Sequence, residues 1–185
     1  MFIRVEETPN PDTLKFIPEK EFEISNSILL TQAKFNNESP FAAEIFKIKG
    51  VKELFITKNF VSVTKDKSHS WDVLKTILTS KIGVYLGSNK PIILKEQSSE
   101  KKISSPIEER IIELLESRVK PVVEGHGGDI SFHSYSKGIV NLELKGSCSG
   151  CPSSTATLKM GIENMLKHYI PEVKEVQDIG EQIRD

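Results

Sequence analysis

The stretch IVNLELKGSCSGCPSSTATLKM, residues 139–160, contains an apolar alternation, a cysteine pair and the start of a helical pattern. Apolar residues at every second position of its first six residues predict a half-buried β-strand. Ser153 or Ser154 is a typical N-cap, and the apolar positions that follow recur at the three- and four-residue spacing of a helix. Between the two patterns, a glycine-rich segment carries Cys148 and Cys151. The sequence therefore predicts both thiols in a loop that joins a strand to the start of a helix.

The residues around this stretch complete an α-β-β-α-β order. Residues 105–108 read SPIE, a capping box with proline at the first helical position, and an apolar stripe continues the helix beyond it. The glycine-rich residues 125–128 end that helix, and residues 129–135 predict a strand that turns back into the strand above. Pro171 ends the C-terminal helix, after which residues 173–179 predict a parallel strand.

The first half of the chain has a different arrangement of elements. Its predicted elements are strands at 2–5, 14–16 and 22–24, a helix capped by Ser39, a hairpin of 51–57 with 60–64, and a helix capped by Ser70. A polar segment, residues 95–104, follows and is typical of a flexible linker. We therefore expect an α+β fold of two small α/β-sandwich domains, residues 1–94 and 105–185.

The composition excludes several classes of protein. The 185 residues include 25 basic and 26 acidic side chains, and a net charge of −1 does not favour a nucleic-acid partner. The longest apolar runs, such as residues 91–94, are too short to span a bilayer, so no membrane partner is expected. The acidic, strand-like N-terminus resembles neither a signal peptide nor a transit peptide. With two cysteines, the chain also lacks the several disulfides of a small secreted scaffold.

Cys148 and Cys151 form a C-x-x-C pair, which is typical of a redox dithiol, of half a zinc site or of half an iron–sulfur site. The adjoining helix start favours thiolates, and the N–H groups of Ser149 and Gly150 would be available to cluster sulfide. Zinc and cysteine-held clusters take four ligands, and one chain supplies two, so two chains meeting at this loop would complete either site. The redox dithiol stays open, although the 34 residues after Cys151 are too few to complete a thioredoxin fold.

The rest of the sequence offers little that resembles a catalytic centre. No pair of carboxylates stands at a spacing that singles it out for acid–base chemistry, and no serine lies in a nucleophile motif, so we expect no enzyme. His126 is a candidate further ligand or proton carrier, but glycine clusters mainly indicate turns, and a turn residue is the simpler interpretation. The first half shows no chemistry, which predicts partner binding or positioning of the second half.

Residues 146–154, GSCSGCPSS, resemble the cysteine segment in the C-terminal domain of the NifU/Nfu iron–sulfur scaffold family. Other segments that match this domain are VKPVV at 119–123, GGDI at 127–130, TLK at 157–159 and GIENML at 161–166. In the first half, TPNPDTLKF at 8–16, together with Trp71, looks like the N-terminal domain of Nfu proteins. The resemblance covers nearly the whole chain, with the two domains in this order.

The resemblance implies a scaffold or carrier that holds a [4Fe–4S] cluster between two subunits and delivers it to apo-proteins. On this basis Cys148 and Cys151 of each chain are the ligands, with a [2Fe–2S] cluster or zinc as the less favoured occupant. The implied partners are apo iron–sulfur proteins, an upstream cluster assembly scaffold, and a second copy of the chain when the cluster is bound. The implied compartment is the bacterial cytoplasm, or the mitochondrial matrix for a trimmed mature chain. A thiol–disulfide oxidoreductase using the same cysteines is the alternative, and a structural zinc-bridged dimer is a third possibility.

Overall fold

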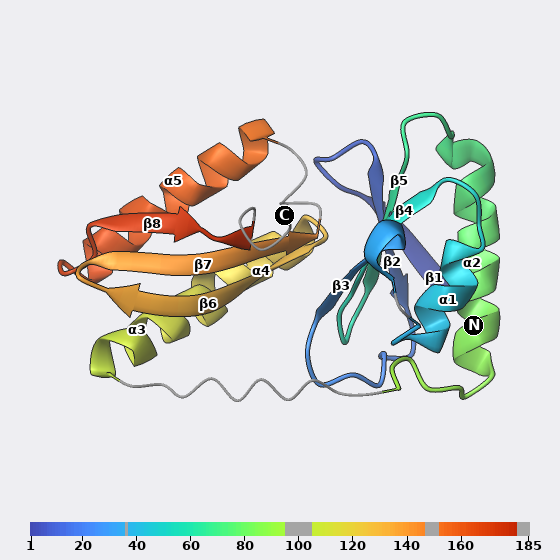
Figure 1. The fold of residues 1–185 in the computed structure, drawn as a ribbon, viewed down its shortest axis with the longest axis horizontal. Helices are drawn as coiled ribbons and strands as arrows, with labels where there is room; N and C mark the ends of the chain where they lie inside the picture. The colour runs from blue at the N-terminus through green and yellow to red at the C-terminus, as the bar shows by residue number, and fades with distance from the viewer. Residues whose placement is uncertain (36, 95–104, 147–151, 181–185) are drawn as a thin grey trace. The chain divides into compact units, whose positions relative to one another are not determined.

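A computed structural model of the chain describes residues 1–35, 37–94, 105–146 and 152–180 (Figure 1). It contains helices, an antiparallel sheet and a mixed sheet, which confirms the predicted α+β class. The chain divides into two compact units, residues 1–98 and 99–185. The predicted linker, residues 95–104, lies outside the described residues.

The first unit is built around a five-stranded antiparallel sheet with the order β1-β2-β5-β4-β3. Its elements are β1 (Ile3–Glu7), β2 (Thr13–Pro18), β3 (Ile28–Thr31), the 3-10 turn η1 (Gln32–Lys34), α1 (Pro40–Phe46), β4 (Val51–Ile56), β5 (Val61–Lys65) and α2 (Trp71–Gly87). The predicted hairpin is confirmed, because β4 and β5 pair directly. Ser39 and Ser70 cap α1 and α2 as predicted, by accepting hydrogen bonds from the N–H groups of Ala42 and Asp72.

One predicted strand of this unit is wrong. Phe22 and Ile24 alternate like strand residues, but the chain there is a loop that buries both side chains in the core. The N–H of Phe22 donates to the carbonyl oxygen of Lys58, in the β4–β5 turn, at 2.7 Å. The edge strand is β3, which the sequence analysis missed and which pairs with β4. An alternating apolar pattern indicates that every second side chain is buried, and a loop that packs against a core gives the same pattern as a strand.

Helices α1 and α2 lie on the same side of the five-stranded sheet and close the core of the first unit (Figure 1). The largest buried side chains of this core are Phe16, Phe22, Phe41, Ile45, Leu54, Ile56, Leu78 and Ile82. Full burial of such a side chain contributes about 1.5–3 kcal/mol to the stability of the fold, relative to leaving it exposed.

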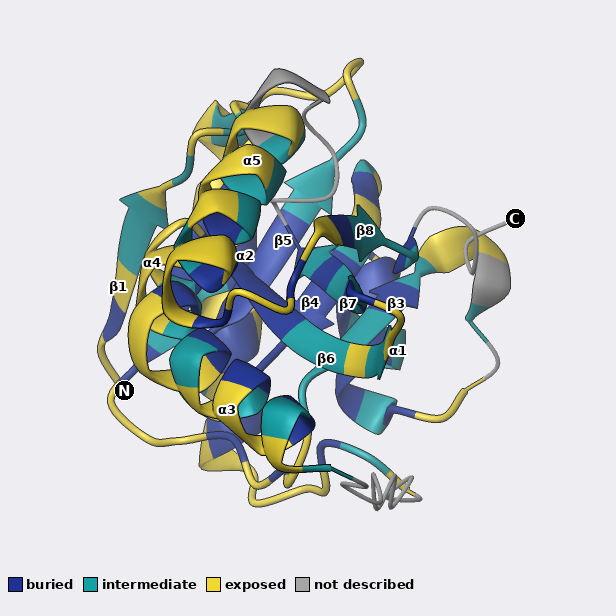
Figure 2. Ribbon diagram, turned by 90° about the vertical axis from the view of Figure 1, so that its left-hand side faces the viewer, coloured by how far each residue is buried: buried dark blue, intermediate teal, exposed yellow. Residues whose placement is uncertain are grey.

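The second unit combines a three-stranded sheet, in the order β6-β7-β8, with helices that bury the apolar face of that sheet. Its elements are α3 (Pro106–Leu114), the π-helical turn η2 (Leu115–Val119), α4 (Lys120–Gly125), β6 (Gly128–Ser136), β7 (Ile139–Gly146), α5 (Pro152–Tyr169) and β8 (Glu175–Asp178). Strands β6 and β7 are antiparallel, whereas β7 and β8 are parallel, which confirms the predicted order and the direction of the last strand. The outward faces of α3 and α5 are exposed (Figure 2).

The first helical run of this unit differs from the single uniform helix that the sequence predicts. Its buried residues on the sheet side, Ile111, Leu115, Val119 and Val123, follow one another at steps of four. An α-helix turns about 400° in four residues, so such a stripe drifts about 40° around the helix at every step. The wider π-helical turn η2 reduces this drift and keeps all four side chains on the sheet.

Helix α5 begins at Pro152, before both serines that the sequence predicts as its cap, so the cap prediction on Ser153 or Ser154 is wrong. Proline suits this position because its φ is already helical and a helix start has no partner for that N–H. Over the ranges that the structure describes, none of the helices combines the length and the apolar character that a membrane span requires.

Candidate metal centre

The candidate ligands Cys148 and Cys151 lie in the segment 147–151, which is outside the described residues. The structure describes both ends of this segment, because β7 ends at Gly146 and α5 begins at Pro152. The segment therefore connects the end of a strand to the start of a helix, which is the junction that the sequence predicts.

Glycines build the strand side of this junction. Gly146 has a φ of +75° and pairs with Gly128 at the end of the β6–β7 ladder. Gly127 has a φ of +78°, and its N–H donates to the carbonyl oxygen of Glu124 at 3.0 Å, which ends α4. Glycine adopts this left-handed backbone without the steric cost of a Cβ. The strand that leads into the cysteine segment thus ends opposite Gly128, the first residue of β6.

A buried acidic residue follows these glycines, and its charge affects Lys120. Asp129 follows Gly128, is 5% exposed, and accepts the N–H of Ile130 at 2.8 Å. Burial lowers the pKa of Lys120, but the negative charges of Asp129 and Glu116 outweigh it and raise that pKa above its ordinary value. Lys120 therefore keeps its positive charge, and its Nζ atom lies 3.3 Å from Glu116 Oε2, one helical turn earlier.

The helix side of the junction is the first turn of α5, whose unpaired N–H groups carry partial positive charge. Glu163 links this helix to the sheet, because its carboxylate accepts the N–H of Val176, in β8, at 3.1 Å. The same carboxylate accepts from Lys167 Nζ, in the next turn of α5, at 2.6 Å. These two hydrogen bonds lower the pKa of Glu163 below its ordinary value, with the Lys167 bond as the larger cause. The sequence pattern does not indicate this role, because the Glu-x-x-x-Lys spacing indicates the ion pair alone.

A second acidic residue, which no sequence pattern indicates, fixes β7 near its end. Asp178 Oδ1 accepts the N–H groups of Leu144 at 3.3 Å and of Gly180 at 2.9 Å. Because Leu144 is two residues before Gly146, the strand is held in place just before the cysteine segment begins.

The histidines lie in different parts of the structure. His126 is exposed at the C-terminal end of α4, and its N–H donates to the carbonyl oxygen of Val123 at 3.1 Å. This position fits a turn residue, and a role as ligand or proton carrier stays a prediction. His168 is in the last turn of α5, about 24 Å along the helix axis from Pro152. Within the part of the chain that the structure describes, no three His, Cys, Asp or Glu side chains form a group that could hold a metal ion.

The proline-rich turn of the first unit is held by contacts with β5 and α2. Lys65 Nζ lies 2.8 Å from Asp12 Oδ1, and Trp71 Nε1 donates to the carbonyl oxygen of Pro11 at 2.9 Å. The segment 8–16 and Trp71, which carry the resemblance in the first half, therefore form one packed structure.

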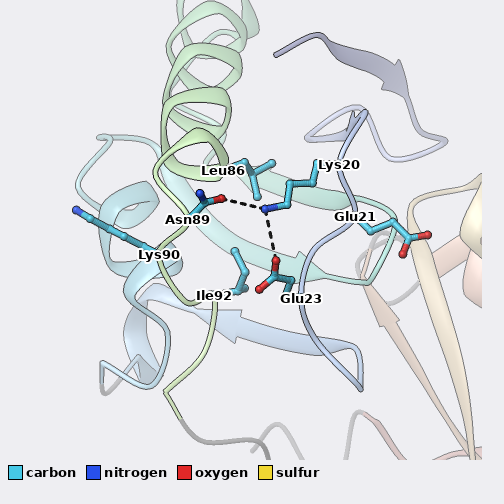
Figure 3. A pocket seen from close by; sticks show the side chains of 7 residues that line it. All are labelled: Lys20, Glu21, Glu23, Leu86, Asn89, Lys90 and Ile92. Carbon is cyan, nitrogen blue, oxygen red and sulfur yellow. Dashed lines mark hydrogen bonds and ion pairs between the residues drawn. The ribbon is translucent and has the colours of Figure 1, made fainter.

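A small hollow lies between the loop after β2 and the end of α2 (Figure 3). Lys20 Nζ is 3.1 Å from Asn89 Oδ1 and 3.4 Å from Glu23 Oε1, so these contacts join the loop to the helix end. The hollow has a volume of about 20 Å³, which is room for one water molecule and far below a ligand pocket.

Comparisons with known proteins match both halves of the chain. The family models for the scaffold protein Nfu/NifU N terminal and for the NifU-like domain match residues 3–89 and 111–177. The human NFU1 iron-sulfur cluster scaffold homolog, mitochondrial, is 39% identical over 100% of this chain and 74% of its own length. The NifU-like protein 4, mitochondrial, of Arabidopsis thaliana is 40% identical over 96% of this chain and 65% of its own length. The solution NMR structure of a NifU-like protein from Saccharomyces cerevisiae is 28% identical, with a TM-score of 0.47, over 52% of this chain and 87% of that chain.

The chain spans 63% to 65% of the length of several of these relatives, including a Drosophila grimshawi NFU1 homolog and the Arabidopsis protein. Identity of 39% over the whole chain is far above what a shared fold alone requires. It confirms the family that residues 8–16 and 146–154 indicate. The chain belongs to the Nfu/NifU family, with an Nfu N-terminal domain followed by a NifU-like domain.

Proposed function

We propose that this protein is an iron–sulfur cluster scaffold and carrier, which binds a [4Fe–4S] cluster between two copies of the chain and delivers it to apo-proteins. The observation that carries the proposal is the position of the two cysteines. Cys148 and Cys151 are the chain's whole complement of thiols, and both belong to the one segment between β7 and α5 of the NifU-like domain. Relatives named iron-sulfur cluster scaffold homologs support the scaffold role.

The number of thiols supports a site shared by two chains. A cluster held by cysteines takes four thiolates, and each chain has two thiols. Two copies that meet at residues 147–151 supply all four ligands. The partial positive charge at the start of α5 stabilises the thiolates and the negatively charged cluster that they hold.

Delivery proceeds by exchange of thiolates between this site and a recipient. Each cysteine thiol of the recipient releases a proton and binds iron, and each released thiolate of Cys148 or Cys151 takes up a proton. The oxidation states of iron and sulfur stay the same throughout. A site shared by two chains opens when the chains separate, which suits a carrier better than an enzyme with a resident cofactor.

The remaining assignments follow from the same proposal. Residues 1–94 bind or position partners, residues 95–104 act as a linker, and residues 105–185 hold the cluster. An upstream assembly scaffold loads the site, and apo iron–sulfur proteins empty it. The relatives are named mitochondrial proteins, which favours the mitochondrial matrix over the bacterial cytoplasm.

Anaerobic reconstitution with iron and sulfide tests the proposal. We expect a brown dimer with about four irons per two chains, the stoichiometry of one [4Fe–4S] centre. Cys148→Ser and Cys151→Ser each remove two of the four ligands of a symmetric dimer, so either variant should lose the cluster and stay monomeric. Ser149→Ala, a neighbour without a thiol, is the matched control and should bind iron like the unsubstituted chain. Iron and sulfide content, the absorption spectrum and the mass in solution are the readouts.

Other outcomes identify the alternatives. Iron binding that survives either serine substitution would refute the ligand assignment. A content of about two irons per two chains would show that the bound cluster is [2Fe–2S] and not [4Fe–4S]. A colourless monomer that cycles its thiols, and whose single-cysteine variants trap mixed disulfides, would be a thiol–disulfide oxidoreductase. A colourless dimer that binds zinc would be the zinc-bridged form.

A further inference from the structure

The end of β7 leads into the cysteine segment, and β6 and β8 hold it over different lengths (Figure 1). On one side the antiparallel pairing with β6 continues to Gly146, which lies opposite Gly128. On the other side the parallel pairing with β8 stops at Leu142, which lies opposite Asp178. The last residues of β7, 143–146, therefore extend beyond the ladder that joins this strand to β8.

The side chain of Asp178 holds β7 where this ladder has ended. Its Oδ1 atom accepts the N–H of Leu144 at 3.3 Å, and the same atom accepts the N–H of Gly180 at 2.9 Å. The N–H of Ile179 donates to the carbonyl oxygen of Leu142 at 2.9 Å. One carboxylate oxygen thus joins the chain that follows β8 to β7, two residues before β7 ends.

The chain around this carboxylate is closely packed against β7. A Cβ added at Gly180 would lie 3.3 Å from the carbonyl oxygen of Leu144, 3.3 Å from Glu143 Cγ and 3.1 Å from Asp178 Oδ1. Leu144 is itself fully buried in the core of the second unit. The packing therefore keeps the Asp178 carboxylate in the position where it accepts both N–H groups.

The anchored N–H is close in sequence to a candidate ligand. Cys148 is four residues after Leu144, so their Cα atoms lie within about 14 Å of each other. Substituting a residue that orients metal ligands from outside the ligand set typically lowers metal affinity by about 10–100-fold. A segment whose end is already fixed also loses less conformational freedom when its thiols bind. We therefore expect this anchor to affect how firmly the thiols hold a cluster.

We propose that Asp178 is a positioning residue of the cluster site, which slows release of the cluster from Cys148 and Cys151 by fixing the end of β7. This inference rests on the proposed function, because it requires a cluster at these two thiols. The charge of Asp178 acts in the opposite direction, since a negative charge near an anionic cluster favours its release. The hydrogen bond and the charge therefore predict opposite effects of substitution.

Two substitutions at this position separate the hydrogen bond from the charge. Asp178→Ala removes both, whereas Asp178→Asn removes the charge and keeps an amide oxygen that accepts the N–H of Leu144. The reconstituted dimer is mixed with an iron chelator under anaerobic conditions, and loss of the brown absorption gives the rate of release. Asp178→Ala should release the cluster at least about tenfold faster than the unsubstituted chain. The rate in Asp178→Asn should be closer to that of the unsubstituted chain than to that of Asp178→Ala.

Val173→Ala is the control for a general loss of stability. Val173 is 3% exposed in the core of the same unit, so its truncation leaves a cavity there. The next residue, Lys174, donates its N–H to the carbonyl oxygen of Gly138, in the turn before β7 and thus at the opposite end of that strand from Gly146. This variant should release the cluster at the rate of the unsubstituted chain.

Hydrogen exchange in the chain without a cluster is an independent measurement of the anchor. The exchange rate of the Leu144 N–H is divided by that of Val140, a fully buried residue near the start of β7, so that global unfolding affects both alike. We expect this ratio to rise about tenfold in Asp178→Ala, where the hydrogen bond is lost. It should change little in Asp178→Asn and in Val173→Ala.

Three results would overturn the inference. They are an unchanged rate of release in Asp178→Ala, slower release in both Asp178 variants, or an equal acceleration in Val173→Ala. An unsubstituted chain that takes up no cluster contradicts the proposed function, and exchange at Leu144 then decides whether Asp178 holds the end of β7. A chain that binds the cluster and releases it equally fast with and without the Asp178 carboxylate contradicts this inference alone.

Discussion

Replacing Glu163 by alanine tests whether a carboxylate holds α5 on the sheet. The carboxylate accepts from Lys167 at 2.6 Å and from the backbone N–H of Val176 at 3.1 Å, and Val176 is fully buried. A hydrogen bond to a charged group contributes about 1.5–3 kcal/mol, and an exposed ion pair adds about 0–1 kcal/mol. The Glu163 side chain is 25% exposed, so the lower part of both ranges applies. Glu163→Ala should lower the free energy of unfolding of the second unit by about 2 kcal/mol.

Glu163→Gln separates the charge from the hydrogen bond. Its neutral amide oxygen still accepts the N–H of Val176, so the expected loss is about 1 kcal/mol. The pKa of Glu163 is lowered, first by Lys167 and then by Val176, so the carboxylate stabilises the fold above its unfolded-state pKa. That stabilisation is lost as the pH falls through the lowered pKa. The difference between the unsubstituted chain and Glu163→Gln should be complete at neutral pH and shrink once the pH falls below the ordinary value of 4.5.

Urea denaturation at several pH values, followed by two signals, measures both effects. Far-UV circular dichroism reports both units, whereas tryptophan fluorescence reports the first unit alone because Trp71 is the chain's single tryptophan. The dichroism transition should shift and the fluorescence transition should not. Glu172→Ala, at an exposed acidic residue of the same unit, is the control and should change the stability by less than about 0.5 kcal/mol. An equally small change in Glu163→Ala, or a Glu163→Gln difference that is independent of pH, would contradict the reasoning.

Two further predictions concern the first unit. Ser39→Ala should lower its stability by about 2 kcal/mol, because the Ser39 hydroxyl accepts the N–H of Ala42 and donates to the buried carbonyl of Ile92. Urea denaturation followed by tryptophan fluorescence measures this loss, and an unchanged midpoint would exclude it. His69→Ala should raise the pKa of Asp66 from about 2 towards its ordinary 3.8, because the hydrogen bond from His69 is the largest cause of the lowered pKa, ahead of Ser68. An NMR titration of the carboxyl carbon checks this, and a pKa that stays near 2 would show that His69 is not the cause.

Local sequence patterns predicted the elements that depend on hydrogen bonds and contacts between residues close together in the sequence. Ser39 and Ser70 cap helices because a cap needs only the next few N–H groups, and the β4–β5 hairpin needs only its own turn. The same reasoning failed at Phe22 and Ile24, where burial against a distant core produced a strand-like alternation. It also missed the π-helical turn, although the four-residue steps of the buried stripe were a readable signal.

The sequence by itself determined how many thiols the candidate site has. Each chain has two thiols, both in one short segment, whereas a cluster held by cysteines takes four thiolates, and the number of thiols is a property of composition. Tertiary structure alone decided what surrounds that segment: Gly128 lies opposite Gly146, and Glu163 accepts the N–H of Val176. It also decided the groove beside the start of α2, because the lining of that groove brings together Ile48 and Val73. Such contacts depend on how the chain folds back on itself, and a local pattern records which side of an element is buried but not what lies against it.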